Sequence, residues 1–176
     1  VDEWQARGIP GGRNESPHYA WDYGSLVPLL YLDPEADVPV VQIPTVILAN
    51  QAEAMQAGRA VHAAAKQLGR RVVYIASSAF SHELVRGRHF KPTAEREALD
   101  RKFIDQLKRG AVAEAIAGFP EYSRTVIAEM NGKPLAGMLG ALQALSEDGV
   151  GLVGEQYGGY AQSSGSGNAS VMVRPR

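Results

Sequence analysis

The stretch "RRVVYIASSAFSHELVRG", residues 70–87, is the main evidence for the predicted fold, because it contains an apolar run that ends abruptly at polar residues. Val72 to Ser77 are all apolar or small, which is typical of a short buried strand. The run breaks at Ser78, and a histidine, His82, follows shortly afterwards. In α/β proteins, ligands bind beyond the carboxyl ends of the strands. The sequence therefore predicts a candidate functional residue at the end of this strand.

Strand-like and helix-like segments alternate along the chain. The β-branched segment 38–48 predicts a second strand, although Pro39 and Pro44 limit its hydrogen bonding. Helices are expected at 51–69, 93–110, 111–117, 121–130 and 133–145, and closing strands at 150–158 and 169–175. Residues 25–32 fit a short helix or strand. This alternation predicts one α/β domain over residues 1–176, with a central mixed sheet flanked by helices on both faces.

The composition limits the classes of partner. The chain is 45% hydrophobic and 21% charged, with a net charge of −1, so we expect neither nucleic acid nor a membrane as its partner. It has no cysteine, which excludes disulfides, thiolate metal sites and cysteine nucleophiles, and is compatible with a cytoplasmic location. No apolar run reaches the roughly 18 residues that span a bilayer.

Three positions carry candidate chemistry, and each has a plain alternative. His82 is either a general acid/base, since unperturbed imidazoles titrate near pH ~6.5, or a cap bonded to backbone. Tyr23, in "WDYGSLVPL" (21–29), either donates a hydrogen bond to a substrate oxygen or is a half-buried ring. Glu129, among apolar neighbours on the expected helix 121–130, is either a metal ligand or a solvated, salt-bridged carboxylate.

The other motifs are weaker. His18, His62 and His89 lie in polar or surface-like contexts, and no pair of histidines has zincin spacing. No nucleophile-elbow or phosphate-loop motif occurs. The glycine-rich segment 162–170 is interpreted as a loop before the last strand.

Four motifs in order give the sequence a family resemblance: "WDYGSLVPL" (21–29), "VVYIASSAFSHEL" (72–84), "VIAEMNGKPLAGMLGAL" (126–142) and "GYAQSSGSGNASVMV" (159–173). The sequence resembles the class III extradiol dioxygenases, the superfamily of protocatechuate 4,5-dioxygenase. It looks most like the 2-aminophenol 1,6-dioxygenase type, in which an Asp-Tyr-Gly turn stands where many relatives carry Asp-His-Gly. The likeness covers nearly the whole chain.

The resemblance implies a non-haem Fe(II) enzyme that cleaves a catechol or 2-aminophenol-like ring with O2. By position, Glu129 matches the glutamate iron ligand, His82 the acid/base and Tyr23 the residue that contacts substrate. Ser81, beside His82, is a second predicted substrate contact. His82 would take a proton from the bound phenol and return one later in the reaction. The implied partners are a small aromatic substrate, O2 and a tightly associated chain or segment.

The resemblance also implies two iron-binding histidines that this chain does not match. In the family they lie in the N-terminal third, whereas this chain begins at "VDEWQARGIPGG", which lacks an initiator methionine and is typical of the end of a helix. We expect the chain to be the C-terminal two-thirds of a larger catalytic unit, with both histidines supplied by an N-terminal segment or another subunit. The alternatives are a metal-free structural subunit and a non-enzymatic binding protein on the same fold.

Overall fold

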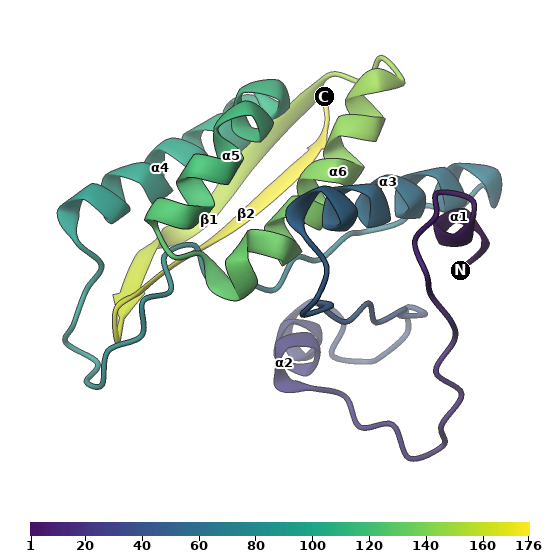
Figure 1. The fold of residues 1–176 in the computed structure, drawn as a ribbon, viewed down its shortest axis with the longest axis horizontal. Helices are drawn as coiled ribbons and strands as arrows, with labels where there is room; N and C mark the ends of the chain where they lie inside the picture. The colour runs from purple at the N-terminus through teal and green to yellow at the C-terminus, as the bar shows by residue number, and fades with distance from the viewer.

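The computed structural model describes residues 1–176 as a mixed helix and strand protein with six α-helices, one 3₁₀ turn and a two-stranded antiparallel sheet (Figure 1). The elements in chain order are α1 (Asp2–Gln5), α2 (Tyr23–Leu32), α3 (Gln51–Gln67), α4 (Ala94–Arg109), α5 (Val112–Thr125), η1 (Glu129–Gly132), α6 (Lys133–Glu147), β1 (Leu152–Ser163) and β2 (Ser166–Pro175). No helix is both long enough and apolar enough to cross a lipid bilayer.

The core lies between the β1–β2 hairpin and helices α4, α5 and α6 (Figure 1). Helix α4 buries Asp100, Phe103, Ile104 and Leu107, one stripe at helical spacing, and it packs against both strands. The Phe103 ring stacks on the Tyr122 ring of α5 with centroids 4.7 Å apart. This rigid body supports the start of β2, which forms part of the candidate site.

Helices α3 and α6 pack side by side through glycines. A Cβ atom on Gly58 would lie 1.8 Å from the Gly137 carbonyl oxygen, and one on Gly140 would lie 2.0 Å from the Met55 carbonyl oxygen. The backbones therefore approach more closely than any residue with a side chain would allow. The prediction of a closely packing, small-residue helix at 133–145 is confirmed.

Local signals predicted most helices correctly. The helix expected at 93–110 is α4: the side chain of Thr93 accepts a hydrogen bond from the Arg96 N–H, and Gly110 ends the helix in the left-handed conformation. The two helices expected at 111–117 and 121–130 are instead one, α5, which continues through Pro120 and ends at Thr125. A proline inside a helix costs about 3 kcal/mol, and burial of Phe119 and Tyr122 on one face of α5 offsets this cost.

The predicted central mixed sheet is not confirmed, because residues 38–48 and 71–77 form no strand. Residues 71–79 make no hydrogen bond between backbone groups, and neither do residues 37–45. Their apolar side chains are exposed, including Val73 at 84% and Val41 at 85%. A strand needs a neighbour that pairs with its backbone, and no segment of this chain provides one. The expected strand–helix–strand crossover over 38–77 is therefore absent.

Candidate functional site

A cavity of about 320 Å³ lies where four segments of the chain meet. These segments are the first turn of α2, the extended stretch 77–82, the first residue of η1 and the start of β2. The residues that line the cavity are Tyr23, Gly24, Ser77, Ser78, Ala79, His82, Glu129, Ser166 and Asn168. Three of the four residues predicted from the sequence, Tyr23, His82 and Glu129, therefore share one cavity.

His82 and Glu129 face each other across this cavity. The distance from His82 Nε2 to Glu129 Oε1 is 3.8 Å, which is ion-pair range but too long for a hydrogen bond. Each side chain is 28% exposed, so both are accessible to a small molecule. The other carboxylate oxygen, Glu129 Oε2, accepts a hydrogen bond of 2.7 Å from the Ala79 N–H. One carboxylate oxygen is thus anchored and the other is directed at the histidine.

The backbone around Glu129 is unusual. Helix α5 ends before it, contrary to the helix predicted over 121–130, and Ile127, Met130 and Asn131 have positive φ angles of 52°, 49° and 58°. A β-branched residue such as Ile127 rarely adopts this conformation, which costs about 1–3 kcal/mol. The sharp turns direct the Glu129 side chain back toward residue 79 rather than along a helix surface. Such strain is concentrated at functional sites.

Tyr23 begins α2 at the open side of the cavity. The Asp22 side chain caps this helix by accepting from the Ser25 N–H at 2.9 Å, and Gln42 Nε2 donates to Asp22 Oδ2 at 2.6 Å. The Tyr23 ring is 80% exposed, and its hydroxyl makes no hydrogen bond within the chain. The alternative prediction of a half-buried Tyr23 ring is therefore wrong. The hydroxyl therefore has no bonding partner among the residues of this chain.

Ser81 lies elsewhere. It is fully buried, and its hydroxyl donates to Asp100 Oδ2 at 2.7 Å, so its side chain does not line the cavity. Its neighbour His82 points the other way, as alternate residues of an extended chain do.

Sequence reasoning did not select Ser77, Ser78, Ser166 and Asn168, although all four line the cavity. Ser166 and Asn168 belong to the glycine-rich segment 162–170, interpreted from the sequence as only a loop. The signal that could have found them is the place of this segment as the last of the four ordered motifs.

The chain alone does not provide a complete set of metal ligands. No group of three or more His, Cys, Asp or Glu side chains is placed to bind a metal ion. At the cavity there is one carboxylate, with one oxygen already bonded to backbone, and one imidazole. A site with two histidines and one carboxylate needs further donors, so these residues do not by themselves fit an iron centre.

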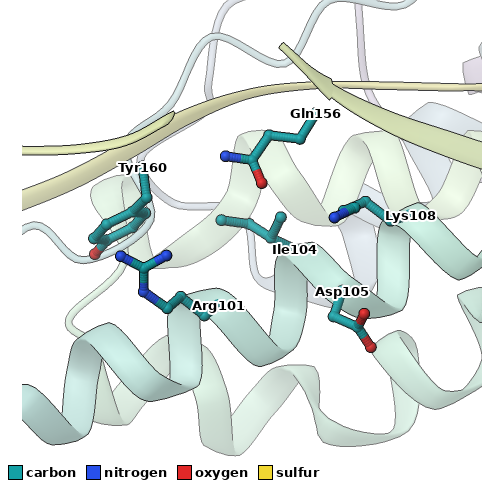
Figure 2. A pocket seen from close by; sticks show the side chains of 6 residues that line it. All are labelled: Arg101, Ile104, Asp105, Lys108, Gln156 and Tyr160. Atoms are coloured by element: carbon teal, nitrogen blue, oxygen red, sulfur yellow. The ribbon is translucent and has the colours of Figure 1, made fainter. Parts of the chain in front are cut away.

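A second, smaller depression of about 180 Å³ lies between α4 and β1 and is lined by Arg101, Ile104, Asp105, Lys108, Gln156 and Tyr160 (Figure 2). The Arg101 guanidinium lies 4.9 Å from the centre of the Tyr160 ring and pairs with Glu97 at 2.7 Å. Its cation is therefore already engaged. None of the residues predicted to be functional lies here.

A histidine and a carboxylate that face each other in an accessible cavity are the kind of pair that proton-transfer sites use, and Tyr23 lines the same cavity. The chain belongs to the family described as the catalytic LigB subunit of aromatic ring-opening dioxygenase, whose model matches residues 2–171. The predicted family is therefore confirmed. Dioxygenases of this family generally use non-haem iron and act on an aromatic substrate with O2.

Proposed function

We propose that this chain carries the acid/base side of the active site of an Fe(II)-dependent extradiol dioxygenase. The substrate class is a catechol or a 2-aminophenol-like aromatic, cleaved with O2. The observation that supports this best is the convergence of His82, Glu129 and Tyr23 on one cavity, within a chain whose family opens aromatic rings.

Each of the three residues has a proposed role. His82 Nε2 takes the proton from a substrate hydroxyl or amino group and returns it to the ring-opened product. Tyr23 donates a hydrogen bond to a substrate oxygen, since its hydroxyl has no partner inside the chain. Glu129 Oε1, with Oε2 held by the Ala79 N–H, is available as a metal ligand. Ser81 is proposed to support His82 rather than to touch substrate.

Glu129 is the residue of this chain that would hold iron, and the iron would supply the chemistry that activates O2. Because this chain offers Glu129 alone as a ligand, we propose that two histidines come from another segment or subunit. The unpaired backbone of residues 71–79 is the place where such a segment would add as a strand, next to the cavity at residues 77–79.

The test is substrate-dependent oxygen uptake by the purified, complete protein supplied with Fe(II), with catechols and 2-aminophenols as substrates. His82→Ala should lower kcat by about 10²-fold or more and leave the iron content unchanged. Glu129→Ala should lower both the iron content and kcat. The matched control is His62→Ala, because His62 lies on α3 and pairs with Asp148 instead of lining the cavity.

The results separate the alternatives. The metal-free structural subunit would be favoured by two results together: no oxygen uptake with any substrate, and an iron content that Glu129→Ala does not change. If His82→Ala and His62→Ala take up oxygen at the same rate, the acid/base role of His82 is rejected. The opposed placement of His82 and Glu129 favours the catalytic subunit, because a structural subunit has no chemical need for either.

A further inference from the structure

A buried carboxylate lies directly behind the candidate site. Asp100 of α4 is 0% exposed and accepts hydrogen bonds from two tyrosine hydroxyls, Tyr122 at 2.9 Å and Tyr160 at 2.5 Å. It also accepts from the backbone N–H of Ser81 at 3.2 Å and from the Ser81 hydroxyl at 2.7 Å. No cation pairs with it.

Two of these four bonds go to the residue that precedes His82. Two backbone contacts also fix Ser81. Its carbonyl oxygen accepts a hydrogen bond from the Gly167 N–H at 2.9 Å, and the residue forms an isolated antiparallel β-bridge with Ala128. The His82 N–H donates to the Val126 carbonyl oxygen at 3.3 Å. The short stretch that carries His82 is thus held between β2 and the turn before Glu129, with Asp100 as its charged anchor.

The start of β2 lies next to the same group. A Cβ atom on Gly167 would lie 2.6 Å from Asp100 Oδ2 and 1.9 Å from the Tyr160 hydroxyl oxygen, so only glycine fits between them. The residues on either side, Ser166 and Asn168, line the cavity. Asp100 therefore lies close behind the start of β2, but its hydrogen bonds go to Ser81, Tyr122 and Tyr160 and not to β2.

Burial of this carboxylate is costly. Desolvation raises the pKa of Asp100, and the hydrogen bonds from Tyr160, Ser81 and Tyr122 only partly oppose that effect. An apolar side chain at this place would leave the donors of Ser81, Tyr122 and Tyr160 without an acceptor, so the carboxylate and its donors are stable only as a network. Through this network Asp100 links α4, α5 and β1 to the backbone beside His82.

We propose that Asp100 is a positioning residue, which holds the His82 ring at the cavity through its two hydrogen bonds to Ser81. This inference rests on the proposed function, because it requires that His82 take part in turnover. Asp100 itself does not touch the cavity. Its effect on the reaction should pass through His82 alone.

The test is a double-mutant cycle on the complete iron-loaded protein, with kcat expressed per folded molecule. Asp100→Asn should lower kcat by about 10-fold or more, since displacement of a catalytic group by about 1 Å costs up to 10²-fold. KM should change much less. In the His82→Ala background, Asp100→Asn should leave the residual kcat unchanged.

Two single variants separate positioning from stability. Ser81→Ala and Tyr122→Phe each remove one hydrogen bond to Asp100, but only Ser81 lies beside His82. Ser81→Ala should lower kcat as Asp100→Asn does, whereas Tyr122→Phe should leave kcat within about 2-fold of the wild-type value. Both variants should lower the urea unfolding midpoint by about the same amount, because each loses one hydrogen bond. If Asp100→Asn does not fold, this pair still decides the question.

Equal losses of kcat on Asp100→Asn in the wild-type and His82→Ala backgrounds would overturn the inference and leave the proposed function intact. Equal effects of Ser81→Ala and Tyr122→Phe on kcat would do the same. If His82→Ala itself has no effect, the proposed role of His82 fails, and the positioning role fails with it.

Discussion

Carboxylates in this chain behave in opposite ways according to their surroundings. Burial raises the pKa of Asp100, whereas the hydrogen bonds from Lys66 and then His62 lower the pKa of exposed Asp148. The distances to Asp148 Oδ2 are 2.8 Å from Lys66 Nζ and 2.9 Å from His62 Nε2. Glu129 differs again, with one oxygen bonded to backbone and the other facing His82. Carboxylates thus have three different settings in this chain: Asp100 is buried, Asp148 is paired at the surface and Glu129 lines the cavity.

The Asp148 cluster predicts a pH dependence of stability. A carboxylate whose pKa is lower in the folded state stabilises the fold above its unfolded pKa, near 3.8, and loses that contribution as the pH falls through the lower folded value. The difference in free energy of unfolding between wild type and Asp148→Asn should therefore shrink below about pH 4. Urea unfolding at a series of pH values measures it. Glu35→Gln, at an exposed site without an ion pair, should show no such trend.

The contact between α3 and α6 leaves no room for a methyl group at Gly58. Both helices lead toward the site. Gln51, at the start of α3, donates to the Ser123 hydroxyl at 2.7 Å and to the Asn131 carbonyl oxygen at 2.8 Å. The strained turn that carries Glu129 is therefore braced by α3 as well as by α6, which follows it directly.

Gly58→Ala should lower the free energy of unfolding by about 1–3 kcal/mol, because the new methyl group would overlap the Gly137 carbonyl oxygen. Gly118→Ala on α5 is the matched control, since a Cβ atom there meets nothing within 4 Å. The control should gain about 0.5–1 kcal/mol, as glycine weakens a helix interior. Chemical denaturation of both variants gives the comparison. Equal gains in both would contradict the tight α3–α6 contact.

The whole molecule is divided between a packed body and extended apolar segments. Helices α4, α5 and α6 with the hairpin bury the core, whereas α2 and the loops on either side of it lie outside that core and contribute no residue to it (Figure 1). Residues 38–45 and 71–77 combine strand-forming composition, mostly exposed apolar side chains and a backbone that makes no hydrogen bond to other backbone groups. Exposed apolar surface of this kind marks a binding surface. It supports the proposal that another segment or subunit adds strands beside the cavity.

Hydrogen exchange on the complete protein tests that proposal. The amides of residues 72–77 should exchange as slowly as those of α4, because a strand from outside the described residues would supply acceptors that this chain lacks. The amides of α4 and of the exposed stretch 12–15 provide the slow and fast references in the same sample. Exchange of residues 72–77 at the fast rate would mean that they form an unpaired loop.

The sequence by itself determined most of the helices and the choice of candidate site residues. Thr93, Gly110 and the apolar spacing between them specify α4 through contacts only a few residues apart, and the small residues of 133–145 specify the α6 contact. The order of the four motifs selected Tyr23, His82 and Glu129, and all three line one cavity. Local hydrogen bonds and side-chain periodicity need no distant partner, which is why these features can be predicted from the sequence.

Only the tertiary structure decided which way the side chains face and which strands pair. It turned Ser81 inward to Asp100 and brought Ser166 and Asn168 to the cavity. It ended the helix expected over 121–130 early, with left-handed residues at Ile127 and Met130. It also left residues 71–77 unpaired, although their composition favours a strand. A strand depends on hydrogen bonds to another segment of chain. A buried carboxylate depends on hydrogen-bond donors that lie far away in the sequence. Neither requirement can be read from neighbouring residues alone.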